Sequence, residues 1–124
     1  MIRKLKPKDI AVTRAEMLLS QNNKCAICGE DISDQPMRSA VLDHNHKTGF
    51  VRAVLHRGCN ALLGKIENTM RMNGLDEDRI HLFLIGTSNY LIKHETQQTD
   101  LLHSTYKTVE EKKEATKRKR KRRK

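Results

Sequence analysis

Two spaced pairs of metal-ligand side chains constrain the fold of this chain more than any other feature. Cys25 and Cys28 are separated by two residues, and His56 and Cys59 repeat this spacing further along. One Cys-x-x-Cys pair alone is often buried or redox-active, but two such half-sites can close a tetrahedral zinc site. The chain has three cysteines, so any set of disulfides would leave one over. The sequence therefore predicts a zinc ion held by these four side chains, with reduced thiols and an intracellular setting.

The composition explains why such a chain would need a metal. Of its 124 residues only 36% are hydrophobic, with two Phe, two Tyr and no Trp, so the apolar core must be small. Small domains commonly add a metal or disulfides to compensate. Because four protein side chains fill the predicted zinc shell, no position is left for a reacting water. We therefore expect this ion to be structural rather than catalytic.

The positive charge of the chain is concentrated at its C-terminal end. The formal net charge is +10, and the last eight residues, 117–124, are all basic. Such a run repels itself and buries nothing, so we expect the tail to be disordered when free. No apolar run reaches transmembrane length and no signal segment is recognisable. We therefore expect no membrane association and a cytoplasmic location.

The residues around the half-sites predict a β-hairpin followed by a helix. A basic arm covers residues 1–12, and Thr13 with Glu16 has the form of a capping box for a helix that ends near residue 22 or 23. Gly29 follows the first half-site, where a left-handed turn is expected. An exposed loop is expected over 30–39, containing Asp31, Ser33, Asp34, Gln35 and Pro36. Strands are predicted at 40–42 and 50–55 around a turn at 47–49, and a helix from Asn60 to the stop at 73–74.

The second half of the chain is predicted to be helical. Segments 75–84 and 89–94 have helical character, with Gly86, Thr87 and Ser88 between them, and residues 100–116 form a further predicted helix that grades into the tail. His81, His94 and His103 lie in this half without partner spacing, so we assign them no role. The predicted divisions are an N-terminal arm (1–12), a zinc-stapled core (13–74), a helical extension (75–106) and a charged helix with the basic tail (107–124).

The segment enclosed by the half-sites carries residues that a structural zinc does not need. It reads Leu42-Asp43-His44-Asn45-His46-Lys47-Thr48-Gly49, followed by Val51-Arg52 and, after the second half-site, by Cys59-Asn60. Together with Cys25-x-x-Cys28, this pattern resembles the phage recombination endonuclease VII family of HNH nucleases over about half of the chain, residues 14–66. The combination of knuckles, Asp-His-x-His-Lys-Thr-Gly and Cys-Asn in this order is specific, whereas a lone Asp-His is not.

The resemblance implies an α+β fold, the zinc-stapled ββα-metal (HNH) domain with flanking helices, and a metal-dependent DNA endonuclease. It also implies that Asp43 and Asn60 hold a catalytic Mg²⁺ or Mn²⁺, that His44 is the general base, and that His46 is an auxiliary group near the scissile phosphate. A phage-encoded enzyme of this kind would act in the cytoplasm of a bacterial host cell.

The chain departs from the family pattern at two places. His56 stands where a fourth cysteine is usual, and three cysteines with one histidine still close around zinc. Residues 75–124 match nothing in the pattern, so the resemblance does not predict a preference for branched over other double-stranded DNA. It leaves both a monomer and a homodimer as alternatives.

The chemistry of these residues supports the same interpretation. Carboxylate and amide oxygens suit Mg²⁺, which keeps several waters and takes phosphate oxygens. An imidazole can be neutral near neutral pH and accept a proton from water. A helix that begins at Asn60 would add free N–H groups that favour an anion. In a regular strand Asp43 and His44 point to opposite faces. For both to reach one metal site the strand must end or bulge, so we predict a distortion near His44.

Basic residues outside this segment are candidates for phosphate contacts. Lys47 and Arg52 lie on the hairpin, with Lys65 a weaker candidate. The tail, which begins Lys117, Arg118, Lys119 and Arg120, is typical of a nuclear-localisation-like address or of a DNA-binding arm, and a nuclease core favours the arm. The alternative function is a non-catalytic zinc-containing nucleic-acid-binding module that leaves Asp43 and His44 idle. An RNA-binding protein is a weaker option, because aromatic platforms for bases are lacking.

Overall fold

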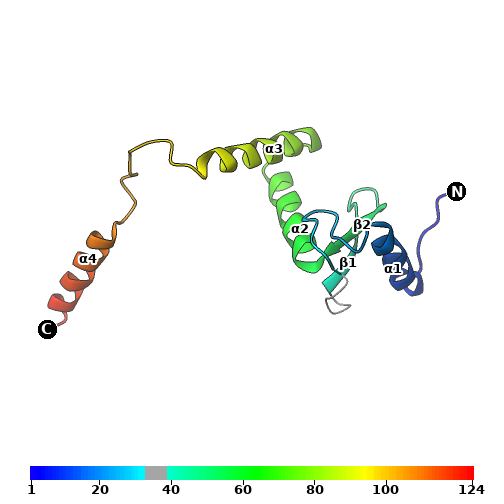
Figure 1. The fold of residues 1–124 in the computed structure, drawn as a ribbon, viewed down its shortest axis with the longest axis horizontal. Coiled ribbons are helices and arrows are strands. Elements are labelled where there is room, and N and C mark those ends of the chain that lie inside the picture. The colour runs from blue at the N-terminus through cyan, green and yellow to red at the C-terminus, as the bar shows by residue number, and fades with distance from the viewer. Residues whose placement is uncertain (33–38) are drawn as a thin grey trace. The chain divides into compact units, whose positions relative to one another are not determined.

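The computed structural model describes residues 1–32 and 39–124, and within them the chain is a small α+β protein, as predicted (Figure 1). The elements in chain order are η1 (Pro7–Asp9), α1 (Ile10–Ser20), β1 (Ala40–His44), β2 (Val51–His56), α2 (Arg57–Met72), α3 (Glu77–His94) and α4 (Val109–Arg122). Of the loop expected over 30–39, Ser33, Asp34, Gln35 and Pro36 lie outside the described residues. Asp31 is exposed and forms an isolated antiparallel bridge with Lys24.

The strands β1 and β2 form the predicted antiparallel hairpin. Its turn is closed by Asn45, whose side-chain oxygen accepts the backbone N–H groups of Lys47 at 2.8 Å and Thr48 at 3.1 Å. Gly49 then has φ +80°, a left-handed conformation that glycine adopts without steric cost. The turn chemistry at 45–49 therefore fixes the length of the hairpin.

The hairpin contains a bulge near His44, so the predicted irregularity is confirmed in its position but does not lie in the strand that carries Asp43 and His44. Leu42 pairs with Val54, but His44 pairs with Val51, so the register shifts between these pairs. Two residues of β2, Arg52 and Ala53, therefore stand opposite the single residue Asp43. The extra residue belongs to β2, while β1 continues to His44.

The core of the hairpin region is small and includes one of the metal-ligand side chains. Its buried residues are Cys25, Ile32, Val54 and Leu55, with Met17, Leu18, Ala40, Leu42, Cys59 and Leu63 packed against them. Gln21 ties the end of α1 to β2, because its amide donates to the Val54 carbonyl at 2.9 Å and accepts the Val54 N–H at 2.8 Å. Helix α1 and the first half-site are thereby fixed to the strand that leads to the second half-site.

The start of the first helix differs from the prediction. Helix α1 begins at Ile10 and not at Thr13, because the turn η1 leads directly into it and the Asp9 carboxylate accepts the Lys6 N–H at 2.9 Å ahead of the helix. The helix ends at Ser20, and Asn22 and Asn23 follow with φ of 55° and 60°.

Helices α2 and α3 also differ from the prediction at their ends. Helix α2 begins at Arg57, three residues before Asn60, so its free N–H groups lie in the second half-site and the Asn60 N–H is already inside the helix. Helix α3 is continuous across residues 86–88. One glycine in a helix interior costs only about 1 kcal/mol relative to alanine, which does not end a helix by itself.

Helix α4 replaces the expected helix over 100–116 and much of the expected disorder in the tail. It starts at Val109 behind a capping box in which Thr108 accepts the Glu111 N–H at 3.2 Å and Glu111 accepts the Thr108 N–H at 2.9 Å. It continues to Arg122, with acidic residues in its first turn and basic residues in its last turn. That charge order complements the helix dipole, which accounts for a helix in the basic run.

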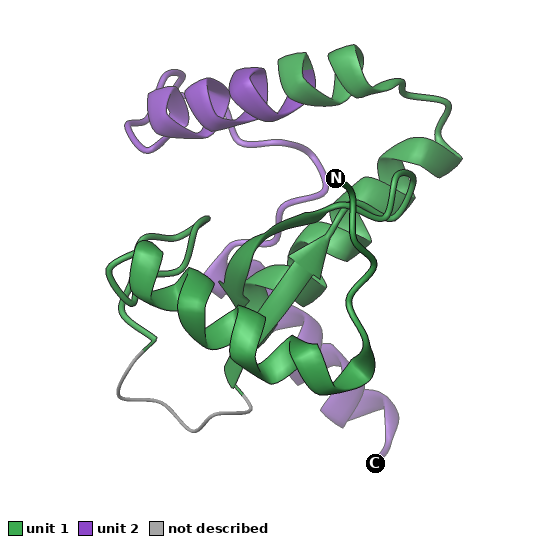
Figure 2. Ribbon diagram, turned by 90° about the vertical axis from the view of Figure 1, so that its right-hand side faces the viewer, with its two compact units in different colours: residues 1–82 green, residues 83–124 purple. Residues whose placement is uncertain are grey.

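The chain divides into two compact units, residues 1–82 and residues 83–124 (Figure 2). The first contains the hairpin, α1 and α2, and α3 begins in it. The second contains the end of α3 and all of α4. Among the described residues, no helix combines the length and apolar character that crossing a bilayer requires.

Candidate functional site

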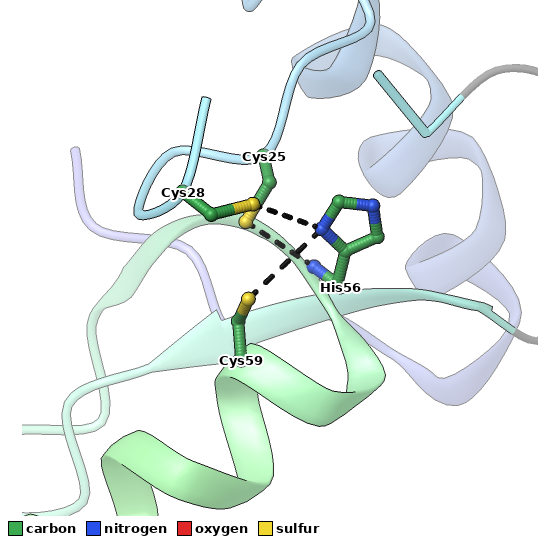
Figure 3. A group of neighbouring side chains, drawn as sticks. All are labelled: Cys25, Cys28, His56 and Cys59. Atoms are coloured by element: carbon green, nitrogen blue, oxygen red, sulfur yellow. Dashed lines mark hydrogen bonds between the residues drawn. The ribbon is translucent and has the colours of Figure 1, made fainter. Parts of the chain in front are cut away.

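Four metal-ligand side chains converge where the first half-site meets the end of the hairpin (Figure 3). Cys25 and Cys28 come from the loop after α1, His56 ends β2, and Cys59 lies in the first turn of α2. Their ligand atoms all lie within 4.8 Å of one another. Gly29, with φ +75°, makes the predicted left-handed turn, and its N–H donates to the Cys25 carbonyl at 3.0 Å. The predicted cluster is therefore confirmed.

The geometry of the cluster fits a tetrahedral metal. The Cys28 Sγ atom lies 3.3 Å and the Cys59 Sγ atom 4.0 Å from His56 Nδ1. Zinc–ligand bonds of about 2.3 Å to sulfur and about 2.0 Å to nitrogen give tetrahedral edges of roughly 3.5 to 3.8 Å. The other ring nitrogen, His56 Nε2, lies 3.3 Å from the Asp31 carbonyl oxygen. That contact suits a histidine that ligates a metal through Nδ1, because such histidines usually donate their second N–H to a carbonyl or carboxylate.

The thiols of the cluster have different proton affinities before a metal binds. Burial raises the pKa of the Cys25 thiol, but hydrogen bonds from the backbone N–H groups of Cys28, His56 and Ile27 lower it by more. The pKa of Cys25 is therefore about 6. Burial and hydrogen bonds with Cys28 and Cys25 raise the pKa of Cys59 to about 11. A metal that takes the Cys59 sulfur near neutral pH must therefore displace its proton.

Asp43 lies on β1 and is buried, with 6% of its surface exposed. Its carboxylate pairs with Arg52 of β2 through two contacts, Nε to Oδ2 at 2.7 Å and Nη2 to Oδ1 at 3.2 Å. The same Nη2 atom lies 3.1 Å from Glu67 Oε1 of α2. The hydrogen bonds to Asp43 and Glu67 raise the pKa of Arg52 above its already high value, so the guanidinium stays charged.

His44 and His46 are exposed, and their rings stack with centroids 4.8 Å apart and planes 17° from parallel. They border different hollows. His44 borders an apolar hollow of about 820 Å³ between the N-terminal residues, α1 and the hairpin, together with Met17 and Phe50. His46 borders a polar groove of about 420 Å³ along α2. The remaining residues that line this groove are Ala61, Gly64, Lys65, Glu67, Asn68 and Arg71.

Asn60 is half-buried in the first turn of α2, directly after Cys59. Helix α2 packs against both strands of the hairpin. Within the described part of the chain, however, no hydrogen bond joins Asn60 to Asp43 or His44. The structure thus brings Asp43 together with Arg52 and Glu67, and His44 together with His46, and leaves Asn60 on the adjoining helix.

The basic residues predicted to contact DNA have different surroundings. Lys47 is exposed and lies 4.0 Å from the Glu77 carboxylate. Arg52 is occupied by Asp43 and Glu67, so its phosphate contact stays a prediction. Lys117, Arg118, Lys119 and Arg120 are all exposed on α4.

Glu67 is a residue of the site that sequence reasoning missed. A signal for it exists, because Asn60, Gly64, Glu67 and Arg71 follow a spacing of four, three and four residues and so share one helical face. That spacing places a second carboxylate on the face of α2 that carries Asn60. It gives no indication that Arg52 is its partner.

Comparison with known proteins agrees with the geometry of the site. No curated protein matches the chain. A family model described as recombination endonuclease VII matches residues 3–91, which is more than half of the sequence and includes the Cys/His cluster, the hairpin and α2. The chain therefore belongs to the recombination endonuclease VII family.

Proposed function

We propose that this protein is an HNH-type, metal-dependent DNA endonuclease that hydrolyses phosphodiester bonds. The observation that carries this proposal is Asp43, a buried carboxylate directly followed by the exposed His44, on a strand fixed beside a four-ligand metal cluster. A protein that only binds nucleic acid has no need of a site for a hard divalent ion beside an imidazole that can accept a proton. Membership of an endonuclease family supports the same activity.

The Cys/His cluster would hold zinc and act structurally. Three thiolate ligands and one imidazole are a ligand set that zinc takes in closed sites, without a position for substrate. Because Cys59 precedes Asn60, a bound zinc would fix the first turn of α2 against the end of β2. Its role is to hold two elements of the active site in a constant relation.

Asp43 and Asn60 would hold the catalytic divalent ion, Mg²⁺ or Mn²⁺. Their oxygens are hard ligands of the kind that these ions prefer, and Arg52 and Glu67 leave one uncompensated negative charge around Asp43. When bound, such an ion supplies charge neutralisation of the scissile phosphate and of the leaving oxygen. Asp43 and Asn60 fit such an ion by the chemistry of their donor atoms. In this structure the cation that pairs with the Asp43 carboxylate is the Arg52 guanidinium.

His44 would act as the general base. In its neutral form it accepts a proton from the water whose oxygen attacks phosphorus, and the bond between phosphorus and the 3′ oxygen breaks. The departing 3′ oxygen takes a proton from solvent, so 5′-phosphate and 3′-hydroxyl ends result. His46 would assist near the phosphate, since it stacks on His44 and borders the groove that contains Lys65 and Arg71. Lys47 and the basic residues 117–124 would add contacts to the DNA backbone.

One observation favours the alternative, a non-catalytic zinc-containing nucleic-acid-binding module. Both oxygens of Asp43 are paired with Arg52, as in a purely structural ion pair. The two functions differ in the need for a divalent ion. Binding through basic residues requires none, whereas hydrolysis at Asp43 and His44 requires Mg²⁺ or Mn²⁺.

The test is incubation of the purified, zinc-loaded protein with supercoiled plasmid and, separately, with a four-way DNA junction. Each substrate is tested with Mg²⁺, Mn²⁺ or Co²⁺ and with no divalent ion. We expect cleavage only in the presence of a divalent ion, and ends that a ligase can reseal because they carry 5′-phosphate. Absence of cleavage under all these conditions, with retention of DNA binding, would establish the binding module instead.

A further inference from the structure

Arg52 lies between two carboxylates from different elements, and the sequence motifs leave this arrangement unexplained. Its Nε atom contacts Asp43 Oδ2 at 2.7 Å. Its Nη2 atom is shared, at 3.2 Å from Asp43 Oδ1 and 3.1 Å from Glu67 Oε1. Asp43 comes from β1, Arg52 from β2 and Glu67 from α2. The guanidinium therefore joins β1, β2 and α2.

The bulge in the hairpin creates this arrangement. In a regular register the pair Leu42–Val54 would be followed by Asp43–Ala53 and then by His44–Arg52. The Arg52 side chain would then lie on the face of the hairpin opposite to Asp43. The extra residue in β2 shifts Arg52 so that it stands opposite Asp43 together with Ala53. A surface strand does not need this irregularity. Its effect here is to bring one arginine to one buried carboxylate.

The two contacts to Asp43 differ in strength. The Nε–Oδ2 contact at 2.7 Å lies at the short end of charge-assisted hydrogen bonds, whereas Nη2 divides its two longer contacts between Asp43 and Glu67. If Nη2 keeps its contact with Glu67 alone, Oδ1 becomes available while Oδ2 stays fixed. An ionised carboxylate has about four lone-pair sites, so one arginine does not exhaust it.

We propose that Arg52 and Glu67 are positioning residues that hold Asp43 by Oδ2 and leave Oδ1 to ligate the catalytic divalent ion. Glu67 retains the guanidinium when Oδ1 is needed and also keeps the local charge negative. This inference rests on the proposed function, because it assigns the ion to Asp43. Groups that hydrogen-bond a ligating carboxylate typically change metal affinity or activity by about 10- to 100-fold when they are removed.

The experiment measures Mn²⁺ binding directly, by calorimetry on the zinc-loaded full chain without DNA. The variants are Glu67→Gln, which keeps the shape of the side chain but removes its charge, and Arg52→Lys, which keeps the charge but loses the planar fork. The matched control is Arg3→Gln, which breaks an exposed arginine–aspartate pair at 3.3 Å, with Asp9, on the N-terminal segment. Melting temperature and zinc content are recorded for every variant.

We expect Arg52→Lys and Glu67→Gln each to weaken Mn²⁺ binding by about 10- to 100-fold and to raise the Mn²⁺ concentration needed for nicking by the same factor. Arg3→Gln should bind Mn²⁺ like the wild type. Because Glu67 acts through Arg52, Glu67→Gln should cost much less in the Arg52→Lys background than in the wild type. A merely structural ion pair would lower the melting temperature of the variants and leave their Mn²⁺ affinity unchanged, which would overturn the proposal.

The result for the wild type separates this proposal from the proposed function. If the wild type binds Mn²⁺ and nicks DNA while Glu67→Gln binds Mn²⁺ equally well, the positioning role is wrong and the nuclease assignment stands. If the wild type neither binds Mn²⁺ nor nicks DNA with any divalent ion, the nuclease assignment fails, and the positioning role fails with it.

Discussion

The two units of the chain use apolar residues in opposite ways. In residues 1–82, Val54 and Leu55 of β2 are buried beside Cys25 and Ile32. In residues 83–124, all of which the structure describes, no residue is buried, although this unit contains Phe83, Ile85, Leu91, Ile92 and Leu101. The second unit does not lack apolar side chains. What it lacks is an arrangement in which they can pack on one another.

The difference shows what orders a small chain. In the first unit, ligands from three segments converge on one cluster, and Gln21 ties α1 to β2, so a few buried side chains suffice. The second unit has helices with good ends, such as the Thr108–Glu111 capping box, but no cross-link between them. Capping and propensity favour a helix, whereas a core needs side chains from several elements held in one place.

The largest expected effect is loss of the metal cluster. Cys59→Ser should unfold the first unit, residues 1–82, because metal binding contributes directly to folding in such domains, by about 10–16 kcal/mol in zinc-finger peptides. Amide hydrogen exchange should then become fast over 40–72 and change little over 109–122. Zinc content and exchange are measured on the same sample. One zinc per chain with a protected hairpin would show that Cys59 is not a ligand.

The next largest effect is on catalysis, which the proposed mechanism confines to the first unit. His44→Ala should lower single-turnover nicking by about 10²- to 10⁴-fold while DNA binding and zinc content persist. Asp43→Ala should also abolish nicking, and excess Mg²⁺ should restore part of it if the loss is one of metal affinity. Nicking at the wild-type rate by His44→Ala would remove this histidine from the mechanism.

A pair of leucine substitutions tests the comparison of the two units directly. Leu55→Ala in β2, where the residue is 2% exposed, should lower the free energy of unfolding by about 2–5 kcal/mol. Leu91→Ala in α3, where the residue is 60% exposed, should change it by at most about 0.5 kcal/mol. Both are measured by urea denaturation at low protein concentration. An equal loss for Leu91→Ala would mean that α3 is covered in solution, and the contrast between the units would fail.

The smallest effect on the protein itself should follow removal of residues 117–124. The unfolding transition of the first unit should not change, and nicking at saturating DNA should persist. The affinity for DNA should fall and depend less on salt. For every phosphate that these residues neutralise in the wild type, their removal should reduce the log–log salt slope by about 0.9. The measurement is a DNA titration at several salt concentrations, and an unchanged slope would mean that these residues do not contact DNA.

The sequence by itself determined the parts of the protein that depend on local geometry. The two-residue gaps of Cys25-x-x-Cys28 and His56-x-x-Cys59 predict the cluster, because short gaps leave few ways to point two ligands at one ion. The left-handed turn at Gly29 follows from an equally local constraint, the absence of a Cβ atom. The irregularity near His44 is predicted from the alternation of a strand together with the requirement that Asp43 and His44 reach one ion. The resemblance of the motif predicts the family.

Only the tertiary structure decided the pairings between distant segments. Arg52 had the pattern of a DNA contact, but the packing of α2 on the hairpin gives it Asp43 and Glu67 as partners. The ends of the helices were also not determined by single residues of the sequence. Helix α2 begins at Arg57 rather than Asn60, and α3 passes through Gly86, because hydrogen bonds along a helix outweigh the preference of a single residue. Spacing along the chain constrains neighbours, whereas contacts between elements depend on how those elements pack.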